Sequence, residues 1–302
     1  MVVPGGAVPP LRRRPRLGNG RLTIDQHGVA SRHSLLNTGT TPDQLRGHVA
    51  AGTLNRITHG WYARPEHDAS VASAIVAGFR ITCLDALAMH GIWVPYRGSR
   101  PPLHVYRPRC RRPCPEDMTA HGTGLRGWPE GDAVASVPLA LEHALHCQDA
   151  ETAAVVLESS IAKGLVTPAQ VQDLLDHAPS RIRSRIGTVS AASESGSETR
   201  VVRALRRRGF RVHQQVYVEG AGFIDAYAGG LFLEIDSRAH HTSASAFETD
   251  RHRDLILRGM GLQVLRLSYN QVWHTWPRTE KSMLHTIGHV GKQGKRRLRA
   301  LL

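Results

Sequence analysis

Apolar and polar positions alternate with the period of a β-strand around a pair of glycines in the C-terminal third of the chain. Gly229-Gly230 separates two short runs rich in β-forming residues, which predicts a tight hairpin. With these glycines as the loop, Asp225 lies directly opposite Glu234, with roughly 4.5–5.5 Å between the two Cβ atoms. Asp236 follows on the same face, two residues beyond Glu234. One face of the hairpin therefore carries three carboxylates.

The opposite face of this hairpin is wholly apolar, and we expect it to pack on a core. The residues predicted to lie there are Ile224, Ala226, Leu231, Leu233 and Ile235. Phe223, Tyr227 and Phe232 share the acidic face, which indicates that this face is partly buried as well. A polar face open to solvent is the alternative, because acidic residues are easily tolerated there.

The periodicity on both sides of the hairpin predicts a mixed α/β (α+β) domain. The expected elements are a helix over Glu198–Arg208, a strand over Arg211–Tyr217, the hairpin, a helix over Ala244–Arg258, a strand over Leu262–Leu267, and a last helix or helices over Asn270–His289. The order is thus α-β-β-β-α-β, followed by helix.

The N-terminal part shows a different pattern of short helices and a hairpin. We expect a helix at His33–Leu36, a second helix from Pro42 to about Ala51 with Leu45 and Val49 on one side, and a hairpin over Leu54–Arg64 that turns at Gly60. Helix, turn, helix and a two-stranded wing form the plan of a winged helix-turn-helix.

These patterns divide the chain into five segments. We expect a disordered basic arm (1–20), a winged helix-turn-helix (21–68), a helical middle region (69–180), the α/β domain (190–290) and a basic tail (291–302). Ser180–Gly196, rich in Ser, Arg and small residues, is expected to form the boundary before the α/β domain. The middle region offers no chemistry that we can assign.

The net charge of +14 is concentrated at the end that carries the acidic hairpin. Residues 180–302 contain 21 Lys and Arg against 10 Asp and Glu, whereas residues 21–179 are nearly neutral. A basic surface around a carboxylate cluster suits a metal-dependent enzyme that acts on a polyanion. A GC-rich genome would explain why Arg outnumbers Lys 35 to 4, but it does not explain the position of the excess.

Neither membrane association nor secretion is expected, because the chain has no apolar run near the ~20 residues of a membrane span and no signal segment. Few, scattered cysteines fit a reducing cytoplasm. Cys110 and Cys114, with His104 and His121 nearby, are conceivable zinc ligands. Because the Cys-x₃-Cys spacing of Cys110 and Cys114 occurs once and without a second cysteine pair, we expect these two residues to be ordinary thiols.

Like charges opposite one another on a hairpin are destabilising, and a hard divalent cation between Asp225 and Glu234 would remove the conflict. Glu198 is a further candidate ligand, because it falls at helical spacing with Val201 and Leu205 and so points toward the sheet. Its alternative role is structural, since Ser195-x-x-Glu198 forms a capping box.

The N-terminal segment resembles the N-terminal winged-helix domain of abortive-infection type IV antitoxins. The resemblance rests on the run from Leu45 through Gly52-Thr53-Leu54 to Arg56, Gly60, Trp61-Tyr62 and Ala63. It implies binding of operator DNA, with Arg46 and Arg56 as contacts, and a cognate toxin or other defence protein as a possible partner. Winged helices also serve as protein contacts, which is the alternative.

Residues ~197–290 resemble the PD-(D/E)XK nuclease superfamily, and more closely its Vsr-like branch, a domain of unknown function related to the very-short-patch mismatch repair endonuclease. The resemblance rests on Glu198, Asp225, Glu234-Ile235-Asp236, His240-His241, Asp250, Arg253-Asp254 and the run from Gly261 to Arg266. It implies a restriction-endonuclease-like αβββαβ core in which Asp225 and Glu234 hold Mg²⁺ or Mn²⁺, with Glu198 reaching the ion directly or through water.

The same resemblance assigns roles to the residues around these ligands. Asp236 stands where the superfamily has Lys, so water activation falls to the metal or to His240 as general base or acid. Arg251 and Arg253 are expected to clamp phosphate or, equally, to pair with neighbouring acids. Ser237 stands where the branch usually has Gly.

We therefore expect a metal-dependent endonuclease of DNA, with an N-terminal winged helix for targeting or regulation. The alternative is a non-catalytic, antitoxin-like DNA-binding regulator with a degenerate nuclease fold. A third reading is an RNA-acting toxin component.

Overall fold

The computed structural model describes residues 24–106, 113–121, 131–236 and 244–298. These residues form two compact units, one within Met1–Arg80 and Pro129–Ala133 and the other within Ile81–Trp128 and Val134–Leu302. Among them, no helix combines the length and the apolar character needed to cross a membrane.

The first unit is built from short helices around a three-stranded sheet. Its elements are β1 (Val29–Ser31), α1 (Arg32–Asn37), α2 (Pro42–Ala50), β2 (Asn55–Thr58), β3 (Trp61–Ala63) and α3 (Ala69–Ala77). β2 and β3 pair antiparallel around Gly60, as expected, while β1, which was not expected, adds to the other edge of β3. The start of α2 follows from a capping box between Thr41 and Gln44.

The core of this unit is small and contains Ala30, Leu35, Leu45 and Leu54. Leu45 and Val49 lie on one side of α2, as expected, and line the same surface pocket. Leu45 is 4% exposed and belongs to the core, whereas Val49 is 38% exposed.

The second unit begins with a region that is mostly, but not wholly, helical. It contains β4 (Arg80–Ile81), α4 (Cys83–Met89), β5 (Leu103–Tyr106), β6 (Met118–His121), α5 (Val137–Cys147), α6 (Ala150–Ala162), α7 (Pro168–His177) and α8 (Ser180–Ile186). The three strands form one sheet in the order β4-β5-β6, which the expectation of a helical middle region did not include. Helix α8 lies in the stretch expected as a boundary, with Ile182 and Ile186 buried.

The rest of the second unit is an α/β layer structure. Its elements are α9 (Gly196–Arg207), β7 (Val212–Val218), β8 (Gly222–Ala228), β9 (Leu231–Ile235), α10 (Ala244–Gly259), β10 (Val264–Leu267), α11 (Tyr269–Trp273) and α12 (Trp276–Leu298). The predicted order of elements is confirmed, but the last helix continues through most of the stretch expected as a tail. The sheet order is β10-β9-β8-β7, with β10 parallel to β9 and the other pairs antiparallel.

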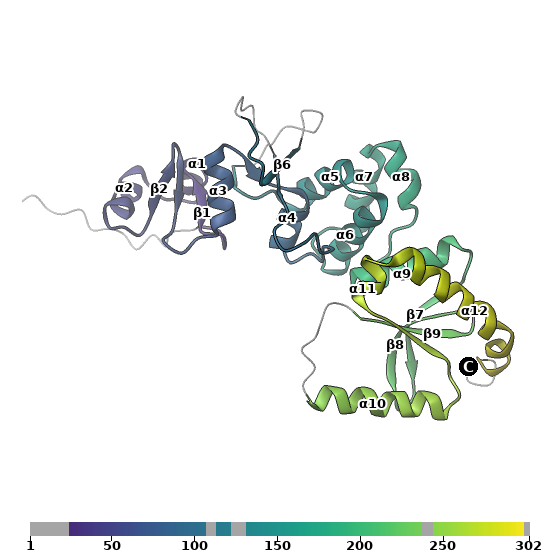
Figure 1. Ribbon diagram of the computed structural model, residues 1–302. Helices are drawn as coiled ribbons and strands as arrows, with labels where there is room; N and C mark the ends of the chain where they lie inside the picture. Colours follow the sequence, from purple (N-terminus) through teal and green to yellow (C-terminus); the bar gives the residue numbers. More distant parts are fainter. Residues whose placement is uncertain (1–23, 107–112, 122–130, 237–243, 299–302) are drawn as a thin grey trace, which may run out of the picture. The chain divides into compact units, whose positions relative to one another are not determined.

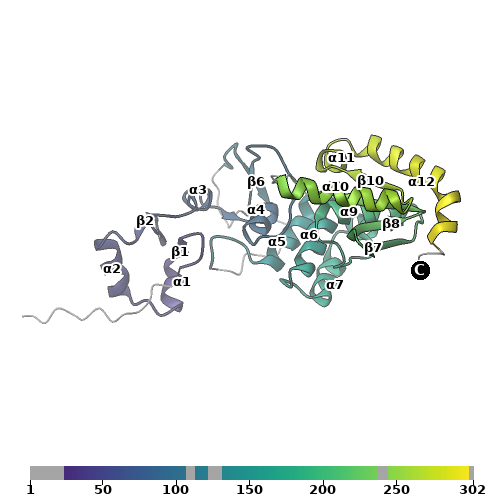
Figure 2. The ribbon, with the colours of Figure 1, turned by 90° about the horizontal axis from the view of Figure 1, so that it is seen from below.

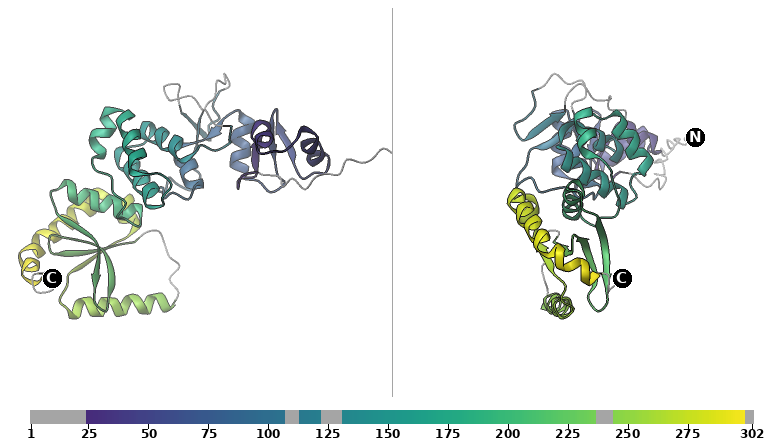
Figure 3. Two further views of the ribbon diagram at one scale, coloured as in Figure 1. Left: turned by 180° about the vertical axis from the view of Figure 1, so that it is seen from behind. Right: turned by 90° about the vertical axis from the view of Figure 1, so that its right-hand side faces the viewer.

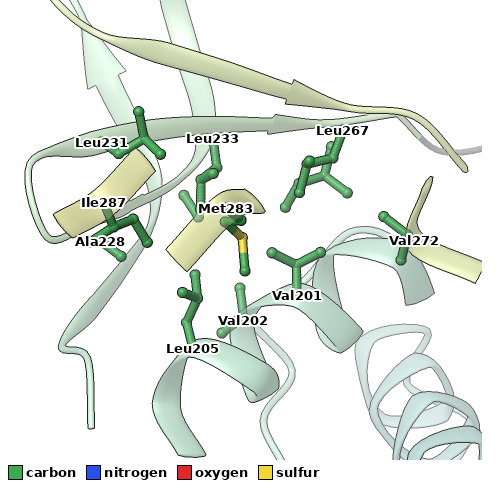
Figure 4. Packing of buried hydrophobic residues seen from close by; sticks show 12 residues of the cluster. Val201, Val202, Leu205, Ala228, Leu231, Leu233, Leu267, Val272, Met283 and Ile287 are labelled. Carbon is green, nitrogen blue, oxygen red and sulfur yellow. The ribbon is translucent and has the colours of Figure 1, made fainter. Parts of the chain in front are cut away.

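Helices cover both faces of this sheet. α9 and α12 lie on one face and α10 on the other (Figures 1 and 3), and Figure 2 views this part of the chain from the α10 side. Val201 and Leu205 of α9 and Met283 and Ile287 of α12 meet Leu233 of the sheet in one apolar core (Figure 4). A second core lies under α10.

The register of the hairpin is the one that the glycine pair predicts. Ala226 pairs with Leu233 and Ala228 with Leu231, so the next residues along the ladder are Asp225 and Glu234. Gly229 has a φ of 60°, and an added Cβ would lie 2.4 Å from Ile287, so both the turn and the cover by α12 require glycine.

The prediction for the two faces was only partly right. Ile224 packs with Tyr227 and Phe232 in the core under α10, and Phe223 is 61% exposed. The difference originates on the neighbouring strand β7, where Gln215 has a φ of 49°. Gln214 pairs with Ala226 and Val216 with Ile224, but Gln215 and Asp225, which lie between them, do not pair. This irregularity interrupts the alternation at Asp225.

α9 also packs on the helical region, through a contact that leaves no room for a side chain. A Cβ at Gly196 would lie 2.2 Å from the ring of Trp93 and 2.6 Å from Val155. Arg203, on the same helix, is 6% exposed and forms ion pairs with Glu158 and Glu151 of α6. These contacts tie α9 to α6.

We expect Gly196→Ala to lower the free energy of unfolding by at least about 1–3 kcal/mol, because it overpacks this junction. Gly259→Ala is the matched control: a Cβ there has nothing within 4 Å, so the change should be neutral or stabilising by up to about 1 kcal/mol. Chemical denaturation measures both. Equal stability of Gly196→Ala and the unmodified protein would contradict the close packing.

Candidate active site

Glu198 is buried at the N-terminal end of α9, with 5% of its surface exposed. Its backbone N–H donates to Ser195 Oγ (3.2 Å), which caps the helix, while its Oε2 accepts from the backbone N–H of Glu194 (2.9 Å) and from Gln215 Nε2 (3.4 Å). The reciprocal half of the expected capping box is not among these contacts. The carboxylate is therefore available for a role beyond capping.

Asp225 lies on β8, where the strand alternation breaks. Its Oδ2 accepts a 2.6 Å hydrogen bond from the backbone N–H of Ile235, which directs the carboxylate toward the end of β9. Burial raises the pKa of Asp225, and the charges of Glu234 and Glu194 raise it further, while the hydrogen bond from Ile235 and the charge of Arg253 lower it.

Glu234 is held by two arginines from different elements. Arg266 Nε on β10 donates to its Oε2 at 2.6 Å, and Arg253 Nη2 on α10 lies 3.1 Å from its Oε1. Arg253 also donates to the carbonyl oxygen of Phe223 (2.7 Å), and Arg266 pairs with Asp254. Two guanidinium groups thus neutralise the carboxylate that is opposite Asp225.

Glu198 and Asp225 are electrostatically coupled. Burial raises the pKa of Glu198, and the negative charge of Asp225 adds to this effect, against the hydrogen bond from Glu194. A helix and two adjacent strands therefore bring Glu198, Asp225 and Glu234 into one charged region. Perturbed acids of this kind, where burial and like charge act together, are characteristic of functional sites.

A pocket of about 440 Å³ lies next to the start of α9, where Glu198 is placed. It is lined by residues of the C-terminal end of α6, of the segment before α9, of α9 and of β7, including Lys163, Ser193, Glu194, Thr199 and Gln215. Glu194 and Gln215 also donate the two hydrogen bonds to Glu198. The pocket thus opens beside the acidic region and contains a cation, Lys163.

The other predicted site residues differ in exposure and in their contacts with the acidic region. Asp236 is exposed, and its backbone N–H donates to Leu267 O (2.9 Å). Arg251 is exposed on α10. His240 lies outside the residues that the structure describes. Arg253, expected to clamp phosphate or to pair with a neighbouring acid, forms an ion pair with Glu234 of β9.

Arg46 and Arg56, the predicted DNA contacts, lie in the first unit and line one pocket of about 440 Å³. Arg32, Val49 and Tyr62 share this pocket. Arg46 forms an ion pair with Asp43, and Arg56 Nη2 lies 3.0 Å from His59 Nδ1. The structure therefore gathers three arginines from α1, α2 and β2 around one depression.

The donor atoms of the three carboxylates do not form a compact set. Within the described ranges, the one group of three or more His, Cys, Asp or Glu side chains whose ligand atoms all lie within 4.8 Å of one another consists of Cys83, His104, His121 and Cys147. The sequence raised His104 and His121 only as neighbours of Cys110 and Cys114, for which ordinary thiols were expected. The cysteine neighbours of the two histidines are Cys83 and Cys147, whereas Cys114 lies elsewhere and Cys110 is outside the described residues.

Comparisons with known proteins add little. No protein-family model matches the chain, and no curated protein does. The solved structure of the Rv2827c protein from Mycobacterium tuberculosis is similar over 57% of this chain and 75% of its own, with 13% sequence identity and a TM-score of 0.26.

We expect Glu198→Gln to stabilise the protein at neutral pH. A raised folded-state pKa means that the folded state binds the proton more tightly than the unfolded state, so stability is lost as pH rises through the ordinary pKa toward the folded one. Gln removes this loss and can still accept the bond from Glu194. The difference in Tm between Glu198→Gln and the unmodified protein should vanish at pH values below the ordinary glutamate pKa of about 4.3.

Thermal denaturation of both proteins across this pH range tests the expectation. Asp236→Asn, an exposed carboxylate of the same region, is the control and should leave the Tm nearly unchanged. A Glu198→Gln protein that is less stable than the unmodified one at pH 7 would show that the buried charge is stabilised by its surroundings.

Proposed function

We propose that this protein is a divalent-metal-dependent endonuclease that cleaves DNA, with the N-terminal unit serving as a DNA-binding winged helix. One observation carries the proposal: a helix and two adjacent strands place Glu198, Asp225 and Glu234 in one charged region, and the charges of neighbouring acids raise the pKa values of Glu198 and Asp225 beyond the effect of burial. The αβββαβ order of the domain and the hairpin register give it further support, because both agree with a restriction-endonuclease-like core.

The donor chemistry of this region suits Mg²⁺ or Mn²⁺. All three side chains offer carboxylate oxygens, the ligands that hard divalent cations prefer. Glu234 Oε1 is buried and accepts no hydrogen bond of good geometry, although Arg253 lies close to it. Asp225 and Glu234 would hold the ion and Glu198 would approach it directly or through water. When bound, the ion would supply charge neutralisation at the scissile phosphate and a lower pKa for water.

The residues of the chain itself would bind, orient and transfer protons. Arg253 and Arg266, which form ion pairs with Glu234, would be free to hold the phosphate backbone once a metal ion neutralises Glu234. Arg251 lies two residues away on α10, which places a further positive charge on that helix. Asp236 adds negative charge, and His240 is our candidate for the general base or acid.

A second function is favoured by the pairing of Glu234. Arg253 and Arg266 already neutralise this acid. A degenerate site that no longer binds metal would need such a substitute for the positive charge of the ion. The protein would then be a non-catalytic DNA-binding regulator, antitoxin-like, with a toxin or another defence protein as partner. Metal binding separates the two functions, because a ligand that binds the folded state raises the Tm.

We expect the unmodified protein to cleave plasmid DNA with Mn²⁺ or Mg²⁺ and to lose cleavage in chelator. Asp225→Asn and Glu234→Gln should each reduce the rate by at least on the order of 10²-fold, the usual effect of removing one group that stabilises transition-state charge. Glu280→Gln, an acid of α12 that pairs with Arg208, is the control and should keep full activity. Full activity in both site variants would end the proposal.

The same assay decides between the remaining functions. Cleavage of RNA but not of plasmid or single-stranded DNA would indicate an RNA-acting enzyme. No cleavage of any substrate, together with no rise of the Tm in Mn²⁺, would favour the regulator.

DNA binding by the first unit predicts a distinct change in salt dependence. If Arg46 and Arg56 contact phosphates, the double variant Arg46→Gln/Arg56→Gln should bind duplex DNA more weakly, and the slope of log K against log salt should fall by about 0.9 for each lost contact. Fluorescence anisotropy over a salt series measures this slope. Arg185→Gln on α8 is the control, and equal slopes in all three proteins would remove the N-terminal pocket from the interface.

A further inference from the structure

Four potential metal ligands meet in the helical region of the second unit, far along the chain from the acidic region. We call Cys83, His104, His121 and Cys147 the Cys/His cluster. One sulfur or ring nitrogen from each lies within 4.8 Å of the others. Nothing in the proposed nuclease chemistry uses these residues.

Each ligand is contributed by a different element. Cys83 is the first residue of α4 and Cys147 the last residue of α5, while His104 lies on β5 and His121 ends β6. β5 and β6 are parallel, and Tyr106 pairs with His121. Since His104 precedes Tyr106 by two residues, the two histidines lie on the same face of the small sheet. The helix ends supply the cysteines from that side.

Two of the separations between ligand atoms are close to those of a small tetrahedral site. His104 Nδ1 lies 3.0 Å from His121 Nε2 and 3.6 Å from Cys147 Sγ. Zinc bonds of about 2.0–2.1 Å to nitrogen and about 2.3 Å to sulfur imply roughly 3.3 Å between two nitrogens and about 3.5 Å between nitrogen and sulfur at tetrahedral angles. The remaining pairs of ligand atoms lie within 4.8 Å of one another.

The surroundings hold these side chains in place. Cys83, His104 and His121 are buried, with 0%, 8% and 7% of their surfaces exposed, while Cys147 reaches the surface. Gln148 Nε2 lies 3.0 Å from Cys147 Sγ and 3.6 Å from Cys83 Sγ, so it can donate to both sulfurs. Cys83 has a φ of 51°, a left-handed conformation that is unusual for a residue other than glycine.

Two further contacts fix the histidines. The backbone N–H of His104 donates to Asp85 Oδ2 at 2.7 Å, which joins β5 to α4. The ring of His143 on α5 stacks on that of His121, with 5.5 Å between the ring centroids, and its Nδ1 lies 2.7 Å from the hydroxyl of Thr82. Outer contacts that orient the ligands are a regular feature of metal sites.

We propose that the Cys/His cluster binds one Zn²⁺ ion in a closed site with four protein ligands. Two sulfurs and two imidazole nitrogens in tetrahedral reach select zinc over the hard cations that carboxylates bind. With no coordination position left for water, the ion is structural. It links α4 and α5 to β5 and β6, which lie between these helices in sequence, and it is independent of the carboxylate site in both ligands and role.

The first test is the metal content of the full-length protein, purified without added chelator. We expect one zinc per chain by elemental analysis. Replacement by Co²⁺ should give the intense visible bands of a tetrahedral ion together with a thiolate-to-cobalt charge-transfer band. Removal of the metal by a chelator should lower the Tm, because the ion binds the folded state.

Variants identify the ligands. Cys147→Ser should lose most of the bound zinc and the charge-transfer intensity while remaining folded, because this side chain reaches the surface. Cys83→Ser and His121→Ala should lose zinc as well, with a greater risk of unfolding. Cys114→Ser is the matched control: its sulfur donates to Met118 O near β6 but lies outside the cluster, so zinc should stay at one per chain.

Several outcomes would overturn the proposal. They are a protein that stays metal-free after incubation with Zn²⁺ under reducing conditions, a disulfide between Cys83 and Cys147 in reductant-purified material, and a full zinc content in Cys147→Ser. Because none of these readouts is nuclease activity, failure of this proposal and failure of the nuclease proposal can be told apart.

Discussion

The fold of the second unit depends on the burial of α9 on both of its sides. Val201, Val202 and Leu205 pack on the four-stranded sheet, while Arg203 enters the helical region and pairs with the buried Glu158. Removing one partner from such a pair leaves an unpaired buried charge, which costs about 3–5 kcal/mol. The apolar side fixes the helix against the strands and the polar side fixes it against α6. Glu198, one turn before Val202, is therefore placed relative to Asp225 by packing at both surfaces, and its position does not depend on a loop.

The charge balance of the acidic region rests on a competition for Glu234. Arg253 and Arg266 form ion pairs with this residue, whereas Asp225 accepts a hydrogen bond from a backbone N–H and Glu198 accepts one from the backbone N–H of Glu194. A metal ion would relieve the repulsion at Asp225 and Glu198 and would free two guanidinium groups for a polyanion. If the two arginines instead remain paired with Glu234, their side chains take the place of a metal ion. This geometry is compatible with both the proposed nuclease and the proposed regulator. The free energy of metal binding, relative to that of the two ion pairs, decides between them.

The sequence predicts what local rules determine, and it fails where distant segments meet. The hairpin register followed from Gly229-Gly230 because the loop length alone sets it. Ile224 was assigned to the wrong face because the irregularity that turns it originates at Gln215, on another strand. β1 and β6 were missed because each has few residues, and β1 gains its strand structure from pairing with β3. The Cys/His cluster has no ligand spacing to detect, since its members come from four elements between Cys83 and Cys147. Only the contact of β5 with β6 and of both with two helix ends brings them together.

The contact between Gly196 and Trp93 limits which substitutions the two positions can accept separately. The indole ring fills the volume that any side chain at 196 would need, so replacement of the glycine alone is disfavoured. A smaller residue at 93 would open the larger part of that volume, next to Val155, at the expense of the contact between the rings of Trp93 and Trp273. The residues at positions 93 and 196 should therefore vary together among homologous sequences, with a large side chain at 93 where 196 is glycine.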